Sequence, residues 1–261
     1  MKFLNIYNLY QHHDLLIAWT KRTIHARYQQ SLLGVLWTII QPTAVVIIFT
    51  VIFTLFIPVD TGDIPYPVFS FSAMLPWTLF AASITDMVDS LVINMNLVSK
   101  IYFPREILPI AAMLARLFDF GIASVLLIIL MLYYRLPFLS LYLLYLPIIL
   151  TIQLLLALGI GLIGAALNVF FRDIKHIFLL GLQLWMYATP IVYPISVVPE
   201  NLRSLYSLNP LVAVIQSYRS VLLLQQPPVS GLSYSAGIAI VICLFGYWLF
   251  KRLEFQFADV V

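Results

Sequence analysis

Long apolar stretches are the feature of this sequence that most restricts its fold. The segments 107–133 and 139–168 contain only two charged residues between them, and each exceeds the about 20 apolar residues that a helix needs to cross a bilayer. Across all 261 residues, 62% are hydrophobic and 10% are charged, whereas soluble domains carry about 25% charged residues. The sequence therefore predicts an all-α polytopic membrane protein with one membrane domain and no separate soluble domain.

Six segments are long and apolar enough to be transmembrane helices. We expect crossings at about 33–57, 68–92, 107–133, 139–168, 176–193 and 232–250. These crossings make residues 31–261 the transmembrane domain. Residues 1–30 precede it, and a helix here would have an apolar side and a polar side that carries Lys21, Arg22 and Arg27. We expect a cytoplasmic amphipathic helix in the membrane interface; a solvated helix packed on its neighbours is the alternative.

The basic residues predict the orientation of the chain. Six crossings place both termini on one side, and ten Lys and Arg residues fall on that side against three on the other, with Arg116 inside a span. The ten are Lys2, Lys21, Arg22, Arg27, Lys100, Arg105, Arg172, Lys175, Lys251 and Arg252, and the three are Arg135, Arg203 and Arg219. By the positive-inside rule, both termini are cytoplasmic, and the protein is expected in the cytoplasmic (inner) membrane.

Two connections between the predicted crossings have a character of their own. The cytoplasmic loop 94–109 is long enough for a short helix, which Pro104 and Pro109 would end. The outer connection 194–228 is rich in proline yet contains the apolar run Leu211–Leu224, which is too short to span the bilayer. We expect short helices or a re-entrant hairpin in this outer connection.

A glycine-rich stretch leads into a charged turn between the fourth and fifth predicted crossings. Gly159, Gly161 and Gly164 match the pattern G-x-G-x-x-G, but they lie within a crossing rather than after a strand, which argues against a dinucleotide site. Ala157, Gly161 and Ala165, each four residues after the last, form a stripe of small residues that lets a second helix approach closely. The turn that follows carries Arg172 and Asp173. They either receive a force from outside the bilayer or anchor the helical hairpin.

The sequence contains no recognisable catalytic set. The four histidines form no His-Glu-x-x-His motif, and the single cysteine, Cys243, excludes an internal disulfide or a cysteine metal cluster. The pattern G-x-x-x-x-G-K-[ST] is also missing, so the chain has no P-loop for ATP. A net charge of +3 is too small for a nucleic-acid surface. We therefore expect that the chain is not an enzyme and has no nucleic-acid partner.

Charged residues within predicted crossings are candidates for function because isolated charges in lipid are costly. Asp86 lies towards the cytoplasmic end of the second crossing, and Arg116 and Asp119 lie about halfway through the third. One interpretation is a hydrated wall along which a polar substrate passes. The other is a structural ion pair, of Arg116 with Asp119 or with Asp86, that locks two helices together.

Aromatic and basic residues supply the remaining candidates. Trp185, Tyr187 and Tyr193 surround the end of the fifth crossing, where they fit an interfacial belt or, alternatively, stack on sugar rings along a translocation path. Three basic residues lie at headgroup depth before the first crossing: Lys21, Arg22 and Arg27. They would bind anionic lipid headgroups or the phosphate of a lipid-linked substrate.

Several short motifs also form a recognisable series over about residues 20–224. They are SLLGVLW followed by Gln41-Pro42, Leu75-Pro76-Trp77, KIYFPREILP ending at Pro109, NVFFRDIK ending at Lys175, TPIVYP ending at Pro194 and Asn209-Pro210. Each motif is weak alone. In this order and spacing they resemble the transmembrane subunits of ABC-2 type polysaccharide exporters, which include permeases for O-antigen, capsular polysaccharide and teichoic acid.

The resemblance implies a division of labour between subunits. Two copies of this chain would form a homodimer around a translocation path and work with two ABC nucleotide-binding subunits. Those subunits would bind ATP and Mg²⁺, while this chain would bind no cofactor. Coupling to them would involve the N-terminal helix and the loop at about Lys100–Glu106, with Lys100, Arg105 and Glu106 as its candidates. Arg172 and Asp173 of the charged turn are the remaining candidates for coupling.

The same resemblance implies the substrate and the gate. The substrate would be a glycan on a polyprenyl pyrophosphate lipid, taken from the cytoplasmic leaflet, and the connection 194–228 would hold the gating helices. Two other classes are weighed against this one. An ion-coupled carrier would use Asp86, Arg116 and Asp119 and need no ATPase, and a membrane transferase would need a catalytic set.

Overall fold

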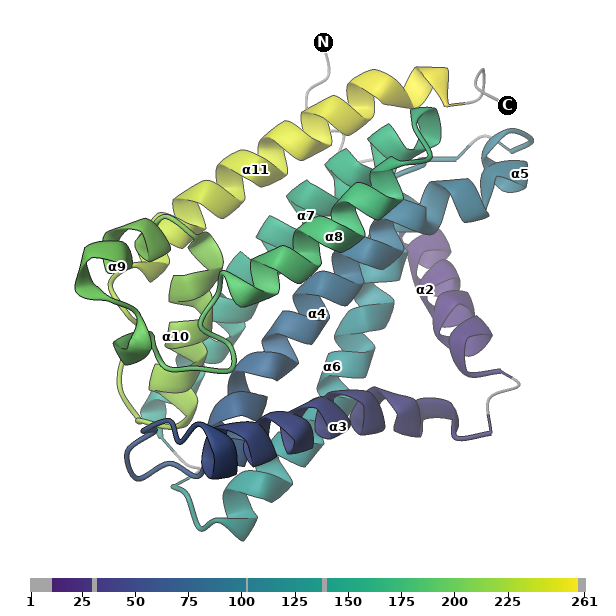
Figure 1. Ribbon diagram of the computed structural model, residues 1–261. Helices are drawn as coiled ribbons and strands as arrows, with labels where there is room; N and C mark the ends of the chain where they lie inside the picture. Colours follow the sequence, from purple (N-terminus) through teal and green to yellow (C-terminus); the bar gives the residue numbers. More distant parts are fainter. Residues whose placement is uncertain (1–10, 30–31, 102, 138–139, 258–261) are drawn as a thin grey trace.

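The computed structural model describes residues 11–29, 32–101, 103–137 and 140–257, and within these ranges its regular elements are helices and none is a strand (Figure 1). The start of the predicted N-terminal helix, including Lys2, lies outside the described residues. So does Tyr102 of the predicted cytoplasmic loop. The described chain is therefore all-α, as the sequence predicts.

Among the residues that the structure describes, five helices are long and apolar enough to cross a membrane. They are Gly34–Phe56, Tyr66–Ile93, Ile107–Tyr133, Leu141–Phe170 and Leu232–Gln256. Their principal parts are α3 (Trp37–Val51), α4 (Tyr66–Ile93), α6 (Ile107–Tyr133), α7 (Leu146–Phe170) and α11 (Leu232–Leu253), with short flanking helical turns η1 (Gly34–Leu36), η2 (Ile52–Phe56), η3 (Leu141–Tyr145) and η5 (Glu254–Gln256). They correspond to the first, second, third, fourth and sixth predicted crossings.

The predicted crossing at 176–193 does not form a helix of membrane-spanning length. It forms α8 (Ile174–Tyr187), a helix of 14 residues, whose length of about 21 Å is less than the roughly 30 Å of a hydrocarbon core. The helix ends before Pro190, because a proline disfavours helical backbone at the preceding residue, Thr189. Residues 188–193 form turns and bends instead of the predicted last part of the crossing.

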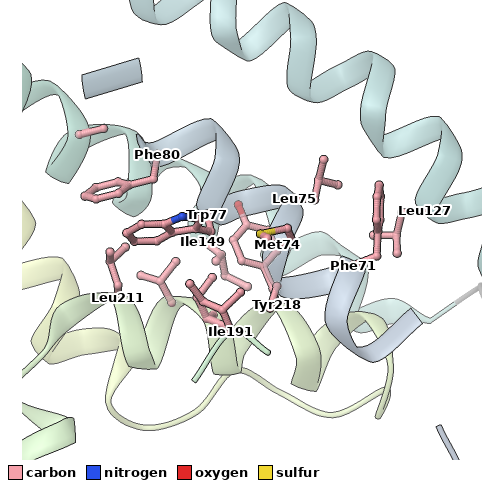
Figure 2. Close-up of a cluster of buried hydrophobic side chains, with 14 of the residues drawn as sticks. Phe71, Met74, Leu75, Trp77, Phe80, Leu127, Ile149, Ile191, Leu211 and Tyr218 are labelled. Atoms are coloured by element: carbon pink, nitrogen blue, oxygen red, sulfur yellow. The ribbon is translucent and has the colours of Figure 1, made fainter. Parts of the chain in front are cut away.

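Helix α4 lies at the centre of the bundle, and 78% of the residues in its most apolar 18-residue stretch are buried. Figure 2 shows Phe71, Met74, Leu75, Trp77 and Phe80 of α4 among buried side chains from other segments. Those partners are Leu127 of α6, Ile149 of α7, Ile191, and Leu211 and Tyr218 of α10. Helix α4 thus packs against other helices rather than lipid.

Buried amides connect α7 to the backbone of α4. The side chain of Gln153 donates a hydrogen bond of 2.8 Å to the carbonyl of Pro76, and Asn168 donates one of 2.9 Å to the carbonyl of Val88. Both amides are buried. In an apolar environment each polar group needs such a partner, so these two bonds fix how α7 is placed on α4.

The glycines of α7 are packing residues, as the sequence analysis predicts. A Cβ atom on Gly159 would lie 2.5 Å from the carbonyl oxygen of Ile242 in α11, and one on Gly246 would collide with the carbonyl of Gly159. On the other side of α7, a Cβ on Gly164 would lie 2.5 Å from a methyl group of Val88 in α4. The small residues therefore let α7 lie close to both α11 and α4.

The predicted cytoplasmic loop 94–109 contains the short helix α5 (Met95–Val98). The expectation that Pro104 and Pro109 end this helix is wrong, because α5 ends at Val98. Pro109 instead lies in the first turn of α6, where a missing N–H group costs no helical hydrogen bond.

The outer connection 194–228 contains three short helices, η4 (Ile195–Val197), α9 (Glu200–Ser207) and α10 (Pro210–Leu222). Figure 1 shows α9 and α10 at one end of the bundle. Helix α5, the α7–α8 turn and the last turns of α11 lie at the other end.

Candidate functional site

The N-terminal helix α2 (His13–Tyr28) packs against α6 and brings polar side chains to it. Leu15 and Trp19 of α2 lie half-buried against a hydrophobic cluster at this end of the bundle. Lys21 and Arg22 are exposed, whereas Arg27 and Tyr28 in the last turn point towards α4 and α6. The helix is thus docked on the bundle rather than separate from it.

Four charged side chains from three helices meet where α2 ends. The two arginines are Arg27 of α2 and Arg116 of α6, and the two carboxylates are Asp86 of α4 and Asp119 of α6. Arg27 donates hydrogen bonds to Asp119 at 2.5 Å and to Asp86 at 2.6 Å. Arg116 donates two to Asp86, at 2.6 Å and 2.9 Å, and lies 3.4 Å from Asp119. We call these four residues the ion cluster.

Tyr28 extends the ion cluster to α3. Its hydroxyl group donates to Asp119 and shares a hydrogen bond of 2.9 Å with the hydroxyl of Thr38. Partial burial and the neighbouring carboxylate raise the pKa of Tyr28 above its usual value, so its hydroxyl stays protonated and able to donate. One tyrosine therefore links α2, α3 and α6.

The charges of the ion cluster balance, with two guanidinium groups facing two carboxylates. The side chains are only 9% to 28% exposed, so an unpaired charge here would be costly. All four carboxylate oxygens accept hydrogen bonds from Arg27, Arg116 or Tyr28. Both ion pairs that the sequence offered as alternatives form, and Arg27 joins them.

A cavity of about 300 Å³ opens beside the ion cluster. It lies between α2, α3, α4 and α6, and both polar and apolar residues line it. The polar lining comes from Arg27, Tyr28, Thr38, Gln41, Thr78, Arg116 and Asp119, and the apolar lining includes Trp37, Pro42, Leu75, Leu79 and Phe120. Such a mixed lining is typical of small-ligand sites.

The predicted coupling loop is tied to the end of α11. Glu106 is buried and accepts a hydrogen bond of 2.7 Å from Lys251, which also donates to Glu254 at 2.9 Å. Arg105 donates through its backbone to the Glu254 side chain at 3.2 Å, and its guanidinium donates to the Glu254 carbonyl. Lys100, in contrast, is exposed. Arg105 and Glu106 therefore hold the loop in place, and Lys100 faces outwards.

The turn between α7 and α8 also combines exposed and anchored charges. Arg172 and Asp173 are exposed, and neither makes an ion pair in the part of the chain that the structure describes. Two residues later, Lys175 forms an ion pair of 2.6 Å with Asp89 of α4. The turn is therefore anchored to α4 by Lys175, and its two exposed charges point to the surroundings.

The three candidate aromatic residues occupy different environments. The ring of Trp185 lies edge-to-face against the ring of Phe80, with 5.4 Å between the ring centres. Its indole N–H donates a hydrogen bond of 2.9 Å to the side chain of Asn209, so Trp185 packs into the core. Tyr187 is exposed. The hydroxyl of Tyr193 donates to the carbonyl of Tyr187 at 2.8 Å, which closes the turn after α8. These residues do not line one common wall.

The buried Arg219 of α10 fixes the chain next to this turn. It donates hydrogen bonds to the carbonyls of Pro190 at 2.7 Å and Ile191 at 2.5 Å, and its guanidinium lies 3.7 Å from the centre of the Phe69 ring. Only 4% of Arg219 is exposed, although the positive-inside count treated it as an outer loop charge. No pattern in the sequence distinguished it from a surface arginine.

Comparison with known proteins adds to this geometry. Residues 14–223 match the family model described as ABC-2 type transporter. The O-antigen export system permease protein RfbA of Myxococcus xanthus is 33% identical over 258 residues, which cover 97% of each chain. The protein of the same name from Klebsiella pneumoniae is 30% identical over 256 residues, 98% of each chain. The polysialic acid transport protein KpsM of Escherichia coli is 27% identical over 245 residues, covering 89% of this chain and 91% of that one.

The helices of membrane-spanning length and these matches define the class of protein, an integral protein of the inner membrane. The chain belongs to the ABC-2 type transporter family. Membership of this family implies that the chain is a membrane subunit of a transporter and that it works with ABC ATPase subunits.

Proposed function

We propose that this chain is the membrane-spanning permease subunit of an ATP-driven exporter of polysaccharide, with an O-antigen-like, lipid-linked glycan as substrate. The observation that carries this proposal is the similarity, over nearly the whole of both chains, to two relatives named O-antigen export system permease. Export of a capsular polysaccharide is the second candidate, because the polysialic acid transport protein also matches, with lower identity and coverage. Teichoic acid is the third substrate class of the resemblance, and no relative described above carries that name.

The working unit in this proposal contains two copies of the chain and two ABC ATPase subunits, which bind ATP and Mg²⁺. Helix α8 would be the fifth of six crossings along the chain, completed by the residues that follow it, and α11 would be the sixth. Leu180 and Leu184 of α8, 59% and 61% exposed, would contact lipid or the second copy. An even number of crossings would place both termini on the same side of the membrane, and the positive-inside rule makes that side the cytoplasm. The short helix α5, the α7–α8 turn and the last turns of α11 lie at one end of the bundle (Figure 1), as this arrangement requires.

The contact surface for the ATPase is proposed at this cytoplasmic end. Lys100, Arg172 and Asp173 are exposed there and are available to a partner. Arg105 and Glu106 act indirectly, since they connect the loop before α6 to the end of α11. A push on this loop would therefore move α6 and α11 together.

The exposed cations of α2, Lys21 and Arg22, are proposed to contact lipid headgroups or the pyrophosphate of the substrate lipid. Arg27 was a third candidate for this role, but its contacts with Asp86 and Asp119 favour a different one. It holds α2 against α4 and α6. Motion of the α2 helix during the transport cycle would then be transmitted through the ion cluster.

The ion cluster argues against an ion-coupled carrier. A coupling carboxylate has to release its partner and take up a cation or proton, whereas all oxygens of Asp86 and Asp119 accept hydrogen bonds here. A charge swap tests this point. If Asp86→Arg combined with Arg116→Asp restores the transport that each single variant loses, the pair is structural; two inactive singles and an inactive double would favour the carrier.

Reconstitution tests the proposed function as a whole. The chain should co-purify with an ABC ATPase subunit from the same organism, and hydrolysis by the complex in nanodiscs should rise when native polyprenyl-diphosphate-linked glycan is added. Glycan-free polyprenyl diphosphate is the matched control for a lipid effect. Transport that continues without any ATPase, or hydrolysis that ignores the glycan-bearing lipid, would refute the proposal.

A further inference from the structure

The cavity beside the ion cluster is lined by both polar and apolar groups. Guanidinium, carboxylate, hydroxyl and amide groups line it together with Trp37, Leu75 and Phe120. Trp37 is 52% exposed, and Gln41, one helical turn after it, is exposed as well. Within the described residues the side chain of Gln41 makes no hydrogen bond to the protein. A flat aromatic surface and an unused amide therefore lie together in the cavity.

The charge of the cavity selects the chemistry of a ligand. Because Arg27 and Arg116 are balanced by Asp86 and Asp119, a phosphate group would find two carboxylates that repel it and no excess positive charge. A neutral ligand with many hydroxyl groups suits the site better, since hydroxyls both donate and accept. Each guanidinium has five N–H donors, and Arg27 uses two of them on the two carboxylates, so N–H groups remain for a ligand.

We propose that this cavity holds a neutral sugar ring of the exported glycan. The ring would lie with its apolar C–H face on Trp37, while its hydroxyls bond to Gln41 and to the N–H groups of Arg27. This inference rests on the proposed function, because it assigns a position to the glycan that the transporter carries. The cavity of about 300 Å³ is at the lower end of small-ligand sites, which suits one or two rings rather than a long chain.

The position of the cavity gives the sugar site a further consequence. Tyr28 and Thr38, which line it, connect α2 with α3 through their hydrogen bond of 2.9 Å. Arg27 lines it too and connects α2 with α4 and α6. A ring bound here therefore contacts α2, α3 and the ion cluster together. A sugar ring in the cavity would stabilise the docked position of α2, so the position of this cytoplasmic helix would depend on whether a glycan is bound.

The test uses the complete complex of permease and ATPase in nanodiscs. The variants are Trp37→Leu and Gln41→Leu. Their matched controls are Trp248→Leu on α11 and Gln183→Leu on α8, at two exposed positions outside the cavity. The probes are native polyprenyl-diphosphate-linked glycan and glycan-free polyprenyl diphosphate. The readout is the lipid concentration that gives half of the maximal ATPase stimulation.

The proposal expects a selective effect. Each cavity variant should raise the half-maximal concentration of the glycan-bearing lipid about tenfold, the loss of roughly one good contact. The response to the glycan-free lipid and to all probes in the controls should stay unchanged. An equal loss for both lipids would instead show a site for phosphate or lipid. Unchanged responses would show that the cavity holds no ligand. Either result overturns the sugar site and leaves the proposed function standing. A wild type that ignores the glycan-bearing lipid overturns the proposed function as well.

A second measurement tests the sugar site even if Trp37→Leu or Gln41→Leu folds poorly. In a Cys243→Ala background, Gln41→Cys places a thiol in the cavity, and glycan released from the lipid should slow its reaction with a small thiol reagent at least fivefold. A Gln183→Cys thiol on α8 should react at the same rate with and without glycan. Equal rates at both positions would overturn the sugar site.

Discussion

Replacement of Asp119 by Asn tests whether the ion cluster holds α2 on the bundle. Asp119 accepts hydrogen bonds from Arg27 at 2.5 Å and from Tyr28, while its 3.4 Å contact with Arg116 is long. Hydrogen bonds to charged groups contribute about 1.5–3 kcal/mol each, although polar contacts within membranes average nearer 0.6 kcal/mol. Asn keeps one acceptor, and Arg27 keeps its bond to Asp86. We therefore expect Asp119→Asn to weaken α2 docking by about 2 kcal/mol, roughly 30-fold.

Hydrogen exchange in nanodiscs measures this loss directly. Backbone amides of α2 should exchange roughly 30-fold faster in Asp119→Asn, if local opening limits their exchange. The matched control is Asp89→Asn, which removes a carboxylate that pairs with Lys175 and lies outside the ion cluster, and it should leave α2 unchanged.

A charge-balanced double variant separates the ion cluster from simple packing. Arg27→Met with Asp119→Leu removes one guanidinium and one carboxylate, and leaves Arg116 paired with Asp86. Apolar replacement of a buried ion pair is often neutral, so α2 exchange should return to within about threefold of the wild type. If Asp119→Asn does not accelerate α2 exchange, or the double variant is worse than the single one, the ion cluster does not control docking.

Three further predictions concern packing, coupling and the aromatic residues. Gly159→Ala should destabilise the purified protein by about 1–3 kcal/mol, because its Cβ would lie 2.5 Å from the backbone of α11. Gly181→Ala, whose Cβ would have no neighbour within 4 Å, should leave the Tm unchanged, and equal Tm values for the two variants would contradict the close contact. Glu106→Gln should lower the Tm because it removes a buried partner of the ammonium on α11, and Lys100→Ala should reduce ATPase stimulation with an unchanged Tm; the reverse pattern would show that these roles are exchanged. Trp185→Phe should lower the Tm through its lost hydrogen bond but leave the affinity for glycan-bearing lipid intact, and a specific loss of affinity would restore a role in the path.

The crossings were predictable because hydropathy is a local property of the sequence. The third predicted crossing has the same bounds as α6, Ile107–Tyr133, since the apolar run itself begins and ends there. The helix predicted at 176–193 ends earlier than its apolar run, because hydropathy continues past Pro190 while the helix does not. The sequence also identified Asp86, Arg116 and Asp119 as exceptional, since charges within apolar runs are costly wherever they lie.

The partners of those charges were beyond the sequence, because pairing depends on the packing of distant helices. Arg27 lies 59 positions from Asp86 and 92 from Asp119, and nothing local distinguishes it from Lys21 or Arg22. Likewise, the sequence offered Glu106 only as a coupling residue, and only the structure shows that contact with the end of α11 buries it.

The amino-acid sequence by itself determined a helical membrane protein, the limits of most of its crossings and the resemblance to a transporter family, because each follows from the composition and order of neighbouring residues. Only the tertiary structure decided that α2 docks through Arg27, that Glu106 is a buried connection to α11, and that Trp37 and Gln41 share a cavity with the ion cluster. These features arise from side chains that meet across several helices. Their energies depend on distance and burial in the folded protein, which spacing along a single chain does not determine.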